Sequence, residues 1–314
     1  MWDRTSRSAA VLAFVLAAAT SRAGPAPAKD HPASAPVFPT RLEEVHLTVV
    51  VRDSAGRLVP NLKPEDFVVL ENGRPQKVQL FGRAVEPGQE EALSLDLGLL
   101  LDTSASMLQE LKLSQEAAVR FLESIPRARD LVTIFFDNDI RISRYNSENQ
   151  QGLFERIADT KGGGDTALYD SISVYLSRVQ DSSGRKILVL FTDGEDTRSA
   201  LGLSEVLQLI RASGVTIYPI AFTAGFAPGS SRALRSKSVL EQMAELTGGQ
   251  VFTPRSSKDL AGIYIRILDE LKAQYVLGYV SDDQTRDGKF RHLKVDVAAK
   301  GLRVRHRSGY FAPS

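Results

Sequence analysis

The chain has 314 residues, enough for one large domain or two of ordinary size, with the apolar and charged fractions of a soluble globular protein. Its formal net charge of +1 argues against a nucleic-acid partner, because binding nucleic acid needs a broad basic surface. The absence of cysteine excludes disulfides, thiolate metal sites and cysteine nucleophiles.

The N-terminus has the three-part pattern of a secretory signal peptide. Arg4 and Arg7 precede an apolar run at 9–19, and small residues follow it. We therefore predict a signal peptide at 1–23, with an uncleaved anchor as the alternative, although the run is short for a bilayer. A Pro- and Ala-rich linker is expected at 24–40. No later segment is long and apolar enough to span a membrane, so the mature protein is expected to be exported, either periplasmic or secreted.

A short β region is predicted at 41–90, where apolar residues alternate with polar ones near the start. Asn72-Gly73 is a strong signal for a type I′ turn, and it predicts a hairpin between strands at 67–70 and 78–81. This many hairpin residues form only a marginal sheet by themselves, so we expect the region to pack on another part of the chain.

Between residues 93 and 273, apolar strand-like runs alternate with amphipathic helical runs. This alternation predicts an α/β fold with a doubly wound, mostly parallel sheet and helices on both faces. The runs at 97–101, 131–136 and 187–191 are apolar throughout, as strands covered on both faces should be. A second β region is predicted at 274–314, and we expect it to form one small sheet with the first.

Polar side chains follow the first of these strands. Asp102, Ser104 and Ser106 lie between that strand and a helix predicted at 107–125. In open α/β sheets, ligands bind at the carboxyl ends of the strands. One carboxylate and two hydroxyls offer only oxygen ligands, which hard cations such as Mg²⁺ prefer. Capping of the following helix is the alternative role for the two serines.

Two further loops supply oxygen ligands. Thr166 follows the glycine-rich sequence 162–164, and Asp193 follows the apolar strand at 187–191. The glycine-rich loop is not a P-loop, because it lacks the Gly-Lys-Ser/Thr ending. As alternatives, Asp165 caps the helix that follows it, and Asp193 is a turn residue.

The three loops together resemble the metal-ion-dependent adhesion site of von Willebrand factor type A domains. The matching motifs are Asp102-Thr103-Ser104-Ala105-Ser106, Gly164-Asp165-Thr166 and Thr192-Asp193-Gly194. The resemblance covers 93–273, and the flanking β regions are similar to those of a group of exported bacterial proteins related to this family.

This resemblance implies a metal site for Mg²⁺ or Mn²⁺. It implies that Ser104 and Ser106 bind the ion directly and that Thr166 does so in a ligand-bound state. Asp102 and Asp193 would act largely through bound waters. The ion would then accept a carboxylate from a partner protein.

Three functional hypotheses follow. The first, favoured here, is an exported adhesion or scaffold module without enzymatic activity, which captures an acidic residue of a partner protein through the metal. The second is a metal-dependent hydrolase. It is less favoured because the four histidines lie outside the α/β region and no nucleophile elbow occurs.

The third hypothesis is an envelope-binding structural protein that acts through its β segments. Basic residues at strand spacing would form a face for an anionic polymer, with an ordinary solvated sheet face as the alternative. These residues are Lys289, Arg291, Arg303, Arg305 and Arg307. The sequence leaves the partner's identity and the oligomeric state open.

Overall fold

The computed structural model describes residues 44–84, 95–124, 130–145, 149–180, 185–222, 226–227 and 229–314. The predicted signal peptide and linker therefore lie outside the described residues. Residues Leu42 to Ser314 form one compact unit. Across the described ranges, no helix has the length and apolar character needed to cross a membrane.

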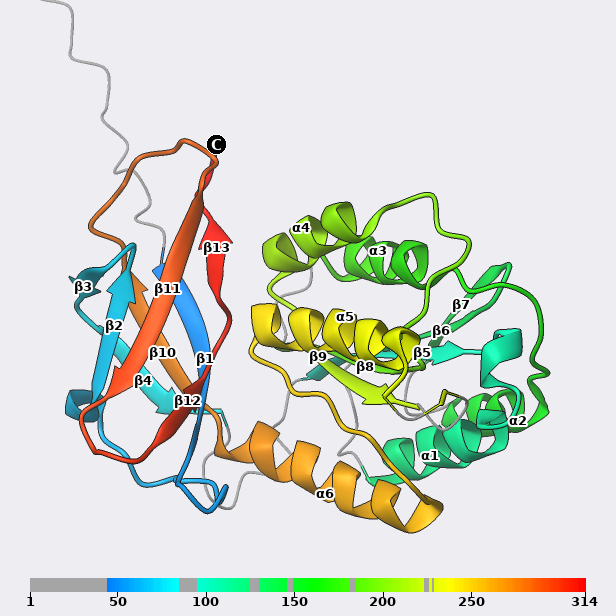
Figure 1. Ribbon diagram of the computed structural model, residues 1–314. Coiled ribbons are helices and arrows are strands. Elements are labelled where there is room, and N and C mark those ends of the chain that lie inside the picture. The colour runs from blue at the N-terminus through cyan, green and yellow to red at the C-terminus, as the bar shows by residue number, and fades with distance from the viewer. Residues whose placement is uncertain are drawn as a thin grey trace, which may run out of the picture. The chain divides into compact units, whose positions relative to one another are not determined.

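The α/β part of this unit contains a five-stranded sheet (Figure 1). In spatial order its strands are β7 (Ile140–Tyr145), β6 (Asp130–Phe136), β5 (Leu95–Asp102), β8 (Arg185–Thr192) and β9 (Thr216–Ala221). Strands β6, β5, β8 and β9 are parallel to one another, and β7 pairs antiparallel with β6 at the edge of the sheet. The mostly parallel sheet is confirmed. The antiparallel edge strand was missed because its charged and half-exposed residues give no apolar run.

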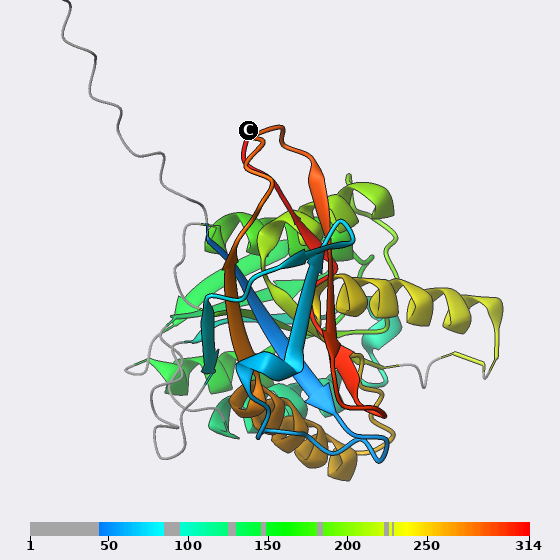
Figure 2. The same cartoon turned by 90° about the vertical axis from the view of Figure 1, so that its left-hand side faces the viewer.

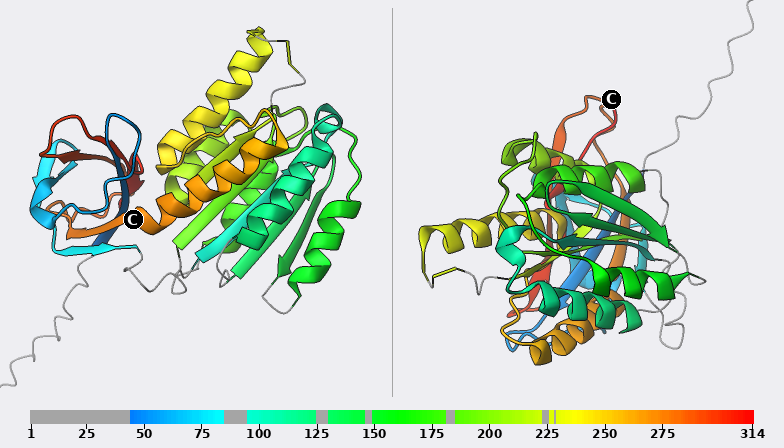
Figure 3. Two further views of the ribbon diagram at one scale, coloured as in Figure 1. Left: turned by 90° about the horizontal axis from the view of Figure 1, so that it is seen from below. Right: turned by 90° about the vertical axis from the view of Figure 1, so that its right-hand side faces the viewer.

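Helices cover both faces of this sheet, and Figure 3 shows α1 and α6 lying across one of them. That face is covered by α1 (Leu111–Ser124), α2 (Gln150–Asp159) and α6 (Ser257–Ala273). The other face is covered by α3 (Leu168–Val179), α4 (Leu203–Ser213) and α5 (Ser231–Thr247). Along β5, Leu97, Leu99 and Leu101 pack on the first face and Leu100 packs on the second. Covering on both sides explains why these strands are continuously apolar.

The N- and C-terminal β regions form two four-stranded sheets, and the predicted single sheet is therefore wrong. One sheet has the order β12 (Arg303–Arg305), β1 (Glu44–Arg52), β10 (Tyr275–Val280), β4 (Leu80–Arg83). The other has the order β13 (Gly309–Phe311), β11 (Phe290–Val297), β2 (Phe67–Glu71), β3 (Arg74–Gln76). Figure 2 shows strands from the two chain ends interleaved. A single exposed sheet would leave one apolar face in water, whereas two sheets bury a shared core.

The predicted hairpin turn is confirmed, but its return strand is not the one expected. Asn72 and Gly73 both have positive φ, 48° and 81°, as a type I′ turn requires. The residues that pair with β2 are those of β3, directly after the turn. Residues 80–83 belong to β4, which pairs with β10 in the other sheet. A two-residue turn fixes the register at once, so the return strand cannot begin several residues later.

The start of the first predicted helix also differs from the prediction. The helix expected at 107–125 begins only at Leu111, because Ala105–Met107 forms a short 3₁₀ helix, η3. Leu108, an apolar residue within that predicted range, is 54% exposed. A second 3₁₀ helix, η1 (Pro64–Asp66), precedes β2.

Two of the five basic residues named in the third hypothesis, Arg291 and Arg305, are paired with carboxylates and do not form an open basic face. The Arg291 side chain is 4% exposed and pairs with Glu71 at 3.4 Å and also with Asp283. Arg305 pairs with Glu270, which is completely buried in α6. Strand spacing alone cannot show that these cations meet carboxylates from distant segments.

Candidate metal site at the carboxyl edge of the sheet

The strand order places Asp102 and Asp193 side by side. From β5 the chain continues to β6 on one side, whereas β8 and β9 lie on the other, so the winding direction reverses between β5 and β8. Asp102 is the last residue of β5, and Asp193 follows the last residue of β8. In doubly wound sheets this switch point is where ligands bind.

Asp102 is fully buried and anchored by two hydrogen bonds. The Thr192 hydroxyl donates to one carboxylate oxygen at 2.6 Å, and the backbone N–H of Ser104 donates to the other at 3.0 Å. Thr192 was missed as a site residue. The parallel register of β5 and β8 would have identified Thr192. In that register Leu101 pairs with Phe191, so Asp102 lies next to Thr192.

The two serines join both carboxylates into one cluster. The Ser104 and Ser106 hydroxyl oxygens lie 3.1 Å apart. The Ser104 hydroxyl also lowers the pKa of Asp102, and the Ser106 hydroxyl lowers that of Asp193, so each hydroxyl lies close to its carboxylate. Although Ser104 precedes η3 at the N-cap position, its side chain makes no capping hydrogen bond. Four of the five predicted residues are thus connected through their side chains.

Thr166 reaches the same edge through its backbone. Gly163 N–H donates to Thr103 O at 2.7 Å, and Ala105 N–H donates to Gly164 O at 2.9 Å. Thr166 O in turn accepts from Thr197 N–H at 2.9 Å. These bonds tie the three predicted loops together, and Thr166 is buried with 2% exposure.

The glycine-rich loop adopts the unusual backbone conformation that its composition indicates. Gly163 and Gly164 have φ values of 155° and 81°. The predicted capping role of Asp165 is wrong, because the residue before α3 is Ala167 and Asp165 is exposed. The loop extends two residues further than the cap pattern suggested, so the helix starts beyond the reach of Asp165.

The electrostatics of the cluster are those of two carboxylates withdrawn from water. Burial, and to a smaller extent the charge of Asp193, raise the pKa of Asp102 to about 7, against the hydrogen bonds from Ser104 and Thr192. Burial likewise raises the pKa of Asp193. A divalent cation at this point would supply the missing positive charge, and the hydroxyl and carboxylate oxygens suit Mg²⁺. The residues present therefore fit such an ion.

A charged pair lies at the rim of the cluster and was not predicted. Glu195 N–H donates to Asp193 Oδ1 at 2.9 Å, and the Glu195 side chain pairs with Arg232 from α5. Glu195 raises the pKa of Asp193 and Arg232 lowers it. Among the described residues, no group of three or more His, Cys, Asp or Glu could hold a metal ion.

These features define an α/β domain with an oxygen-donor cluster at the switch point of a doubly wound sheet. The sequence profile of the von Willebrand factor type A domain matches residues 96–265. The chain belongs to the von Willebrand factor type A family, whose domains mediate protein–protein interactions.

Several solved structures resemble this fold at low sequence identity. A von Willebrand factor type A protein from Catenulispora acidiphila has 12% identity and a TM-score of 0.48, covering 88% of this chain and 75% of its own. An aerotolerance-related membrane protein from Bacteroides fragilis has 14% identity and a TM-score of 0.46, covering 57% and 98%. The vWF domain of the type V pili tip protein Mfa5 from Porphyromonas gingivalis has 11% identity and a TM-score of 0.46. The match covers 56% of this chain and 94% of that domain's chain. No curated protein matches the chain.

Proposed function

We propose that the α/β domain is an exported, non-enzymatic protein-binding module, periplasmic or secreted, that captures an acidic residue of a partner protein through Mg²⁺ or Mn²⁺. The proposal is supported chiefly by one observation: Asp102, Ser104, Ser106 and Asp193 converge at the switch point of the sheet. Family membership supports the protein-binding part.

Each residue has a proposed role. Ser104 and Ser106 bind the ion directly, while Asp102 and Asp193 hold its waters. Thr166 becomes a direct ligand when the partner is bound. Since hydroxyls carry no formal charge, the bound ion keeps enough positive charge to attract a carboxylate.

Binding is favoured over hydrolysis by what surrounds the cluster. The histidines at 46, 292 and 306 all belong to the N- and C-terminal β regions, away from the carboxyl edge of the α/β sheet. No histidine general base therefore accompanies the cluster among the described residues. The groups that the cluster can present to a ligand are therefore its hydroxyl and carboxylate oxygens.

The metal part is tested with a serine pair. Wild type is expected to bind one Mg²⁺ or Mn²⁺ per chain in isothermal titration and to melt at a higher temperature with metal, because a ligand of the folded state stabilises it by mass action. The double variant Ser104→Ala, Ser106→Ala should lose both effects. The matched control is Ser177→Ala with Ser238→Ala, two exposed serines on helices. Equal metal binding by the site variant and the control would overturn the site.

The partner part is tested by pull-down from envelope extract. Wild type and the control pair should retain a partner with Mg²⁺ and release it with a chelator, and the site variant should retain none. If the partner is retained equally with and without the chelator, metal-dependent capture is contradicted. Metal-dependent turnover of generic phosphate or ester substrates would instead establish the hydrolase.

A further inference from the structure

A cavity lies at the amino-terminal edge of the α/β sheet, opposite the oxygen-donor cluster. It has a volume of about 580 Å³, a size typical of small-molecule sites. Its walls come from the starts of β8 and β9, the C-terminal ends of α4 and α5, and strands β1 and β10. The whole cavity lies within the compact unit from Leu42 to Ser314.

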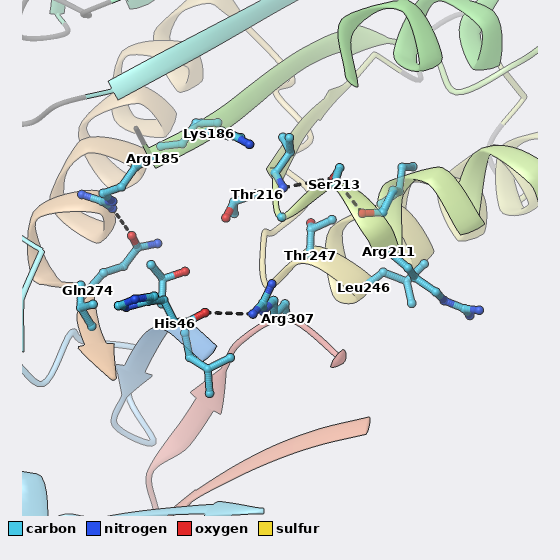
Figure 4. Close-up of a pocket in the computed structure, with 17 residues that line it drawn as sticks. His46, Arg185, Lys186, Arg211, Ser213, Thr216, Leu246, Thr247, Gln274 and Arg307 are labelled. Atoms are coloured by element: carbon cyan, nitrogen blue, oxygen red, sulfur yellow. Dashed lines mark hydrogen bonds between the residues drawn. The ribbon is translucent and has the colours of Figure 1, made fainter. Parts of the chain in front are cut away.

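Positive charge dominates the polar lining of this cavity. Figure 4 shows Arg185, Lys186 and Arg307 around it, and Arg211 also lines it. Among the described residues, no aspartate or glutamate lines the cavity. Apolar side chains form the rest of the wall: Leu47, Ile187, Ile210, Val215, Leu246 and Val276.

Two of the guanidinium groups are buried with incomplete hydrogen bonding. Arg185 donates from Nη2 to Leu271 O at 3.2 Å and to the Gln274 side chain. Arg307 donates from Nη2 to His46 O at 2.9 Å. Within the described part of the chain, Arg185 Nη1 and Arg307 Nε are buried and have no partner. Buried donors of this kind are costly unless a ligand satisfies them.

No carboxylate compensates these two charges in the described structure. Burial lowers the pKa of both Arg185 and Arg307, and the groups that oppose this shift are tyrosines. Those tyrosines include Tyr218 and Tyr279, whose own pKa values burial raises, so they are neutral at pH 7. Glu44 lies 3.4 Å from the His46 ring, and both of these side chains are about half exposed.

We propose that this cavity binds a small organic oxyanion, a phosphate or carboxylate group carried on an apolar body. The planar guanidinium groups of Arg185 and Arg307 hold the oxyanion, because their donors match the geometry of carboxylate and phosphate oxygens. The apolar wall packs against the rest of the ligand. This site is separate from the metal cluster and does not depend on it.

The test compares melting temperatures in phenyl phosphate, inorganic phosphate and benzoate against sodium chloride at equal ionic strength. Wild type should gain several degrees in phenyl phosphate or benzoate, and Arg307→Gln should lose at least half of that gain. Arg303→Gln is the control, because Arg303 is exposed on β12 and does not line the cavity. The comparison between variants removes the general stabilisation that phosphate gives to any protein.

Each outcome decides the proposal. A purely structural role for Arg307 would lower the melting temperature equally in all solutions and leave the gain unchanged, which overturns the site. No gain in wild type beyond that in sodium chloride also overturns it. A rise in melting temperature with benzoate but with neither phosphate supports the site and assigns a carboxylate ligand. A rise with phenyl phosphate and inorganic phosphate but not with benzoate assigns a phosphate ligand. If Arg307→Gln does not fold, Arg185→Gln takes its place in the comparison.

Discussion

At the carboxyl edge of the sheet, the register between β5 and β8 determines which side chains lie next to each other. Asp102 accepts from Thr192 because β5 and β8 are in parallel register, and the same register brings Asp193 close enough to raise the Asp102 pKa. Ser106 then connects to Asp193 from the loop after β5. The raised pKa of Asp102 therefore results from where the fold places these side chains, and not from any unusual residue type.

Thr166→Ala is expected to weaken partner binding more than metal binding, because Thr166 is proposed as a direct ligand mainly in the partner-bound state. We expect about a tenfold loss in partner affinity, equivalent to about 1.4 kcal/mol. Isothermal titration of Mg²⁺ and of the purified partner measures both. Thr253→Ala, an exposed threonine outside the three loops, is the control. A larger loss for the metal than for the partner would contradict the assignment.

His306 makes folding sensitive to acid. Its Nε2 accepts from Val295 N–H at 3.0 Å, so the proton lies on Nδ1, which donates to Arg307 O at 2.6 Å. Burial lowers the His306 pKa below its ordinary value of 6.5. Below about pH 6.5 the unfolded chain gains a proton that the folded protein does not, so the unfolding free energy falls as pH decreases, by at most about 1.4 kcal/mol per pH unit from this group.

Denaturant unfolding between pH 7 and pH 5 checks this expectation. His306→Gln should lose less stability over that interval than wild type, because it cannot take up the proton. His292→Gln is the control, since His292 is exposed on β11. The same pH slope in wild type and His306→Gln would show that the acid sensitivity comes from other groups.

At the scale of elements, close approach of α3 to the sheet depends on the glycine in β5. A Cβ atom at Gly98 would lie 2.3 Å from the Tyr175 ring. That tyrosine crosses the strand and donates its hydroxyl to Ile187 O at 3.1 Å in β8. The absence of a side chain at Gly98 thus lets one helix bond to the strand beyond its nearest neighbour.

Gly98→Ala is therefore expected to destabilise the fold by about 1–3 kcal/mol, as overpacking does. Gly152→Ala is the matched control in α2, where a Cβ would meet nothing within 4 Å. That control should stabilise by about 0.5–1 kcal/mol, because alanine is the better helix former. Urea midpoints measure both changes, and destabilisation by the two variants alike would argue against the packing explanation.

At the scale of the whole described unit, Glu270 joins α6 to strands from both β regions. It is completely buried, and it accepts from Tyr218 at 2.8 Å in β9 and from Arg52 at 2.9 Å in β1. Arg305 in β12 completes the network. One carboxylate thus connects segments that the chain separates by as many as 218 positions.

Glu270→Ala is expected to cost about 3–5 kcal/mol, because it leaves two partly buried guanidinium groups without their partner. The urea midpoint should fall while the slope of the transition stays the same. Asp269→Ala, an exposed neighbour on the same helix, should leave the midpoint nearly unchanged. Equal midpoints for the two variants would show that the network contributes little.

The sequence by itself determined the layered α/β fold and indicated five oxygen-donor residues for the candidate site, although it missed Thr192. Continuous apolar runs, and carboxylates at the carboxyl ends of such runs, are local patterns of the sequence, and they persist in any compact arrangement of those elements. Asn72-Gly73 likewise fixed its turn, because its backbone conformation depends on those two residues alone.

Only the tertiary structure decided what depends on distant partners. The division of the β strands into two sheets, the ion pairs of Arg291 and Arg305 and the oxyanion cavity around Arg185 and Arg307 all join residues far apart in the chain. A charged residue at strand spacing has the same pattern whether it faces solvent, a carboxylate or a cavity. Which of these it meets is settled by long-range register and burial, and neither is encoded within a short stretch of sequence.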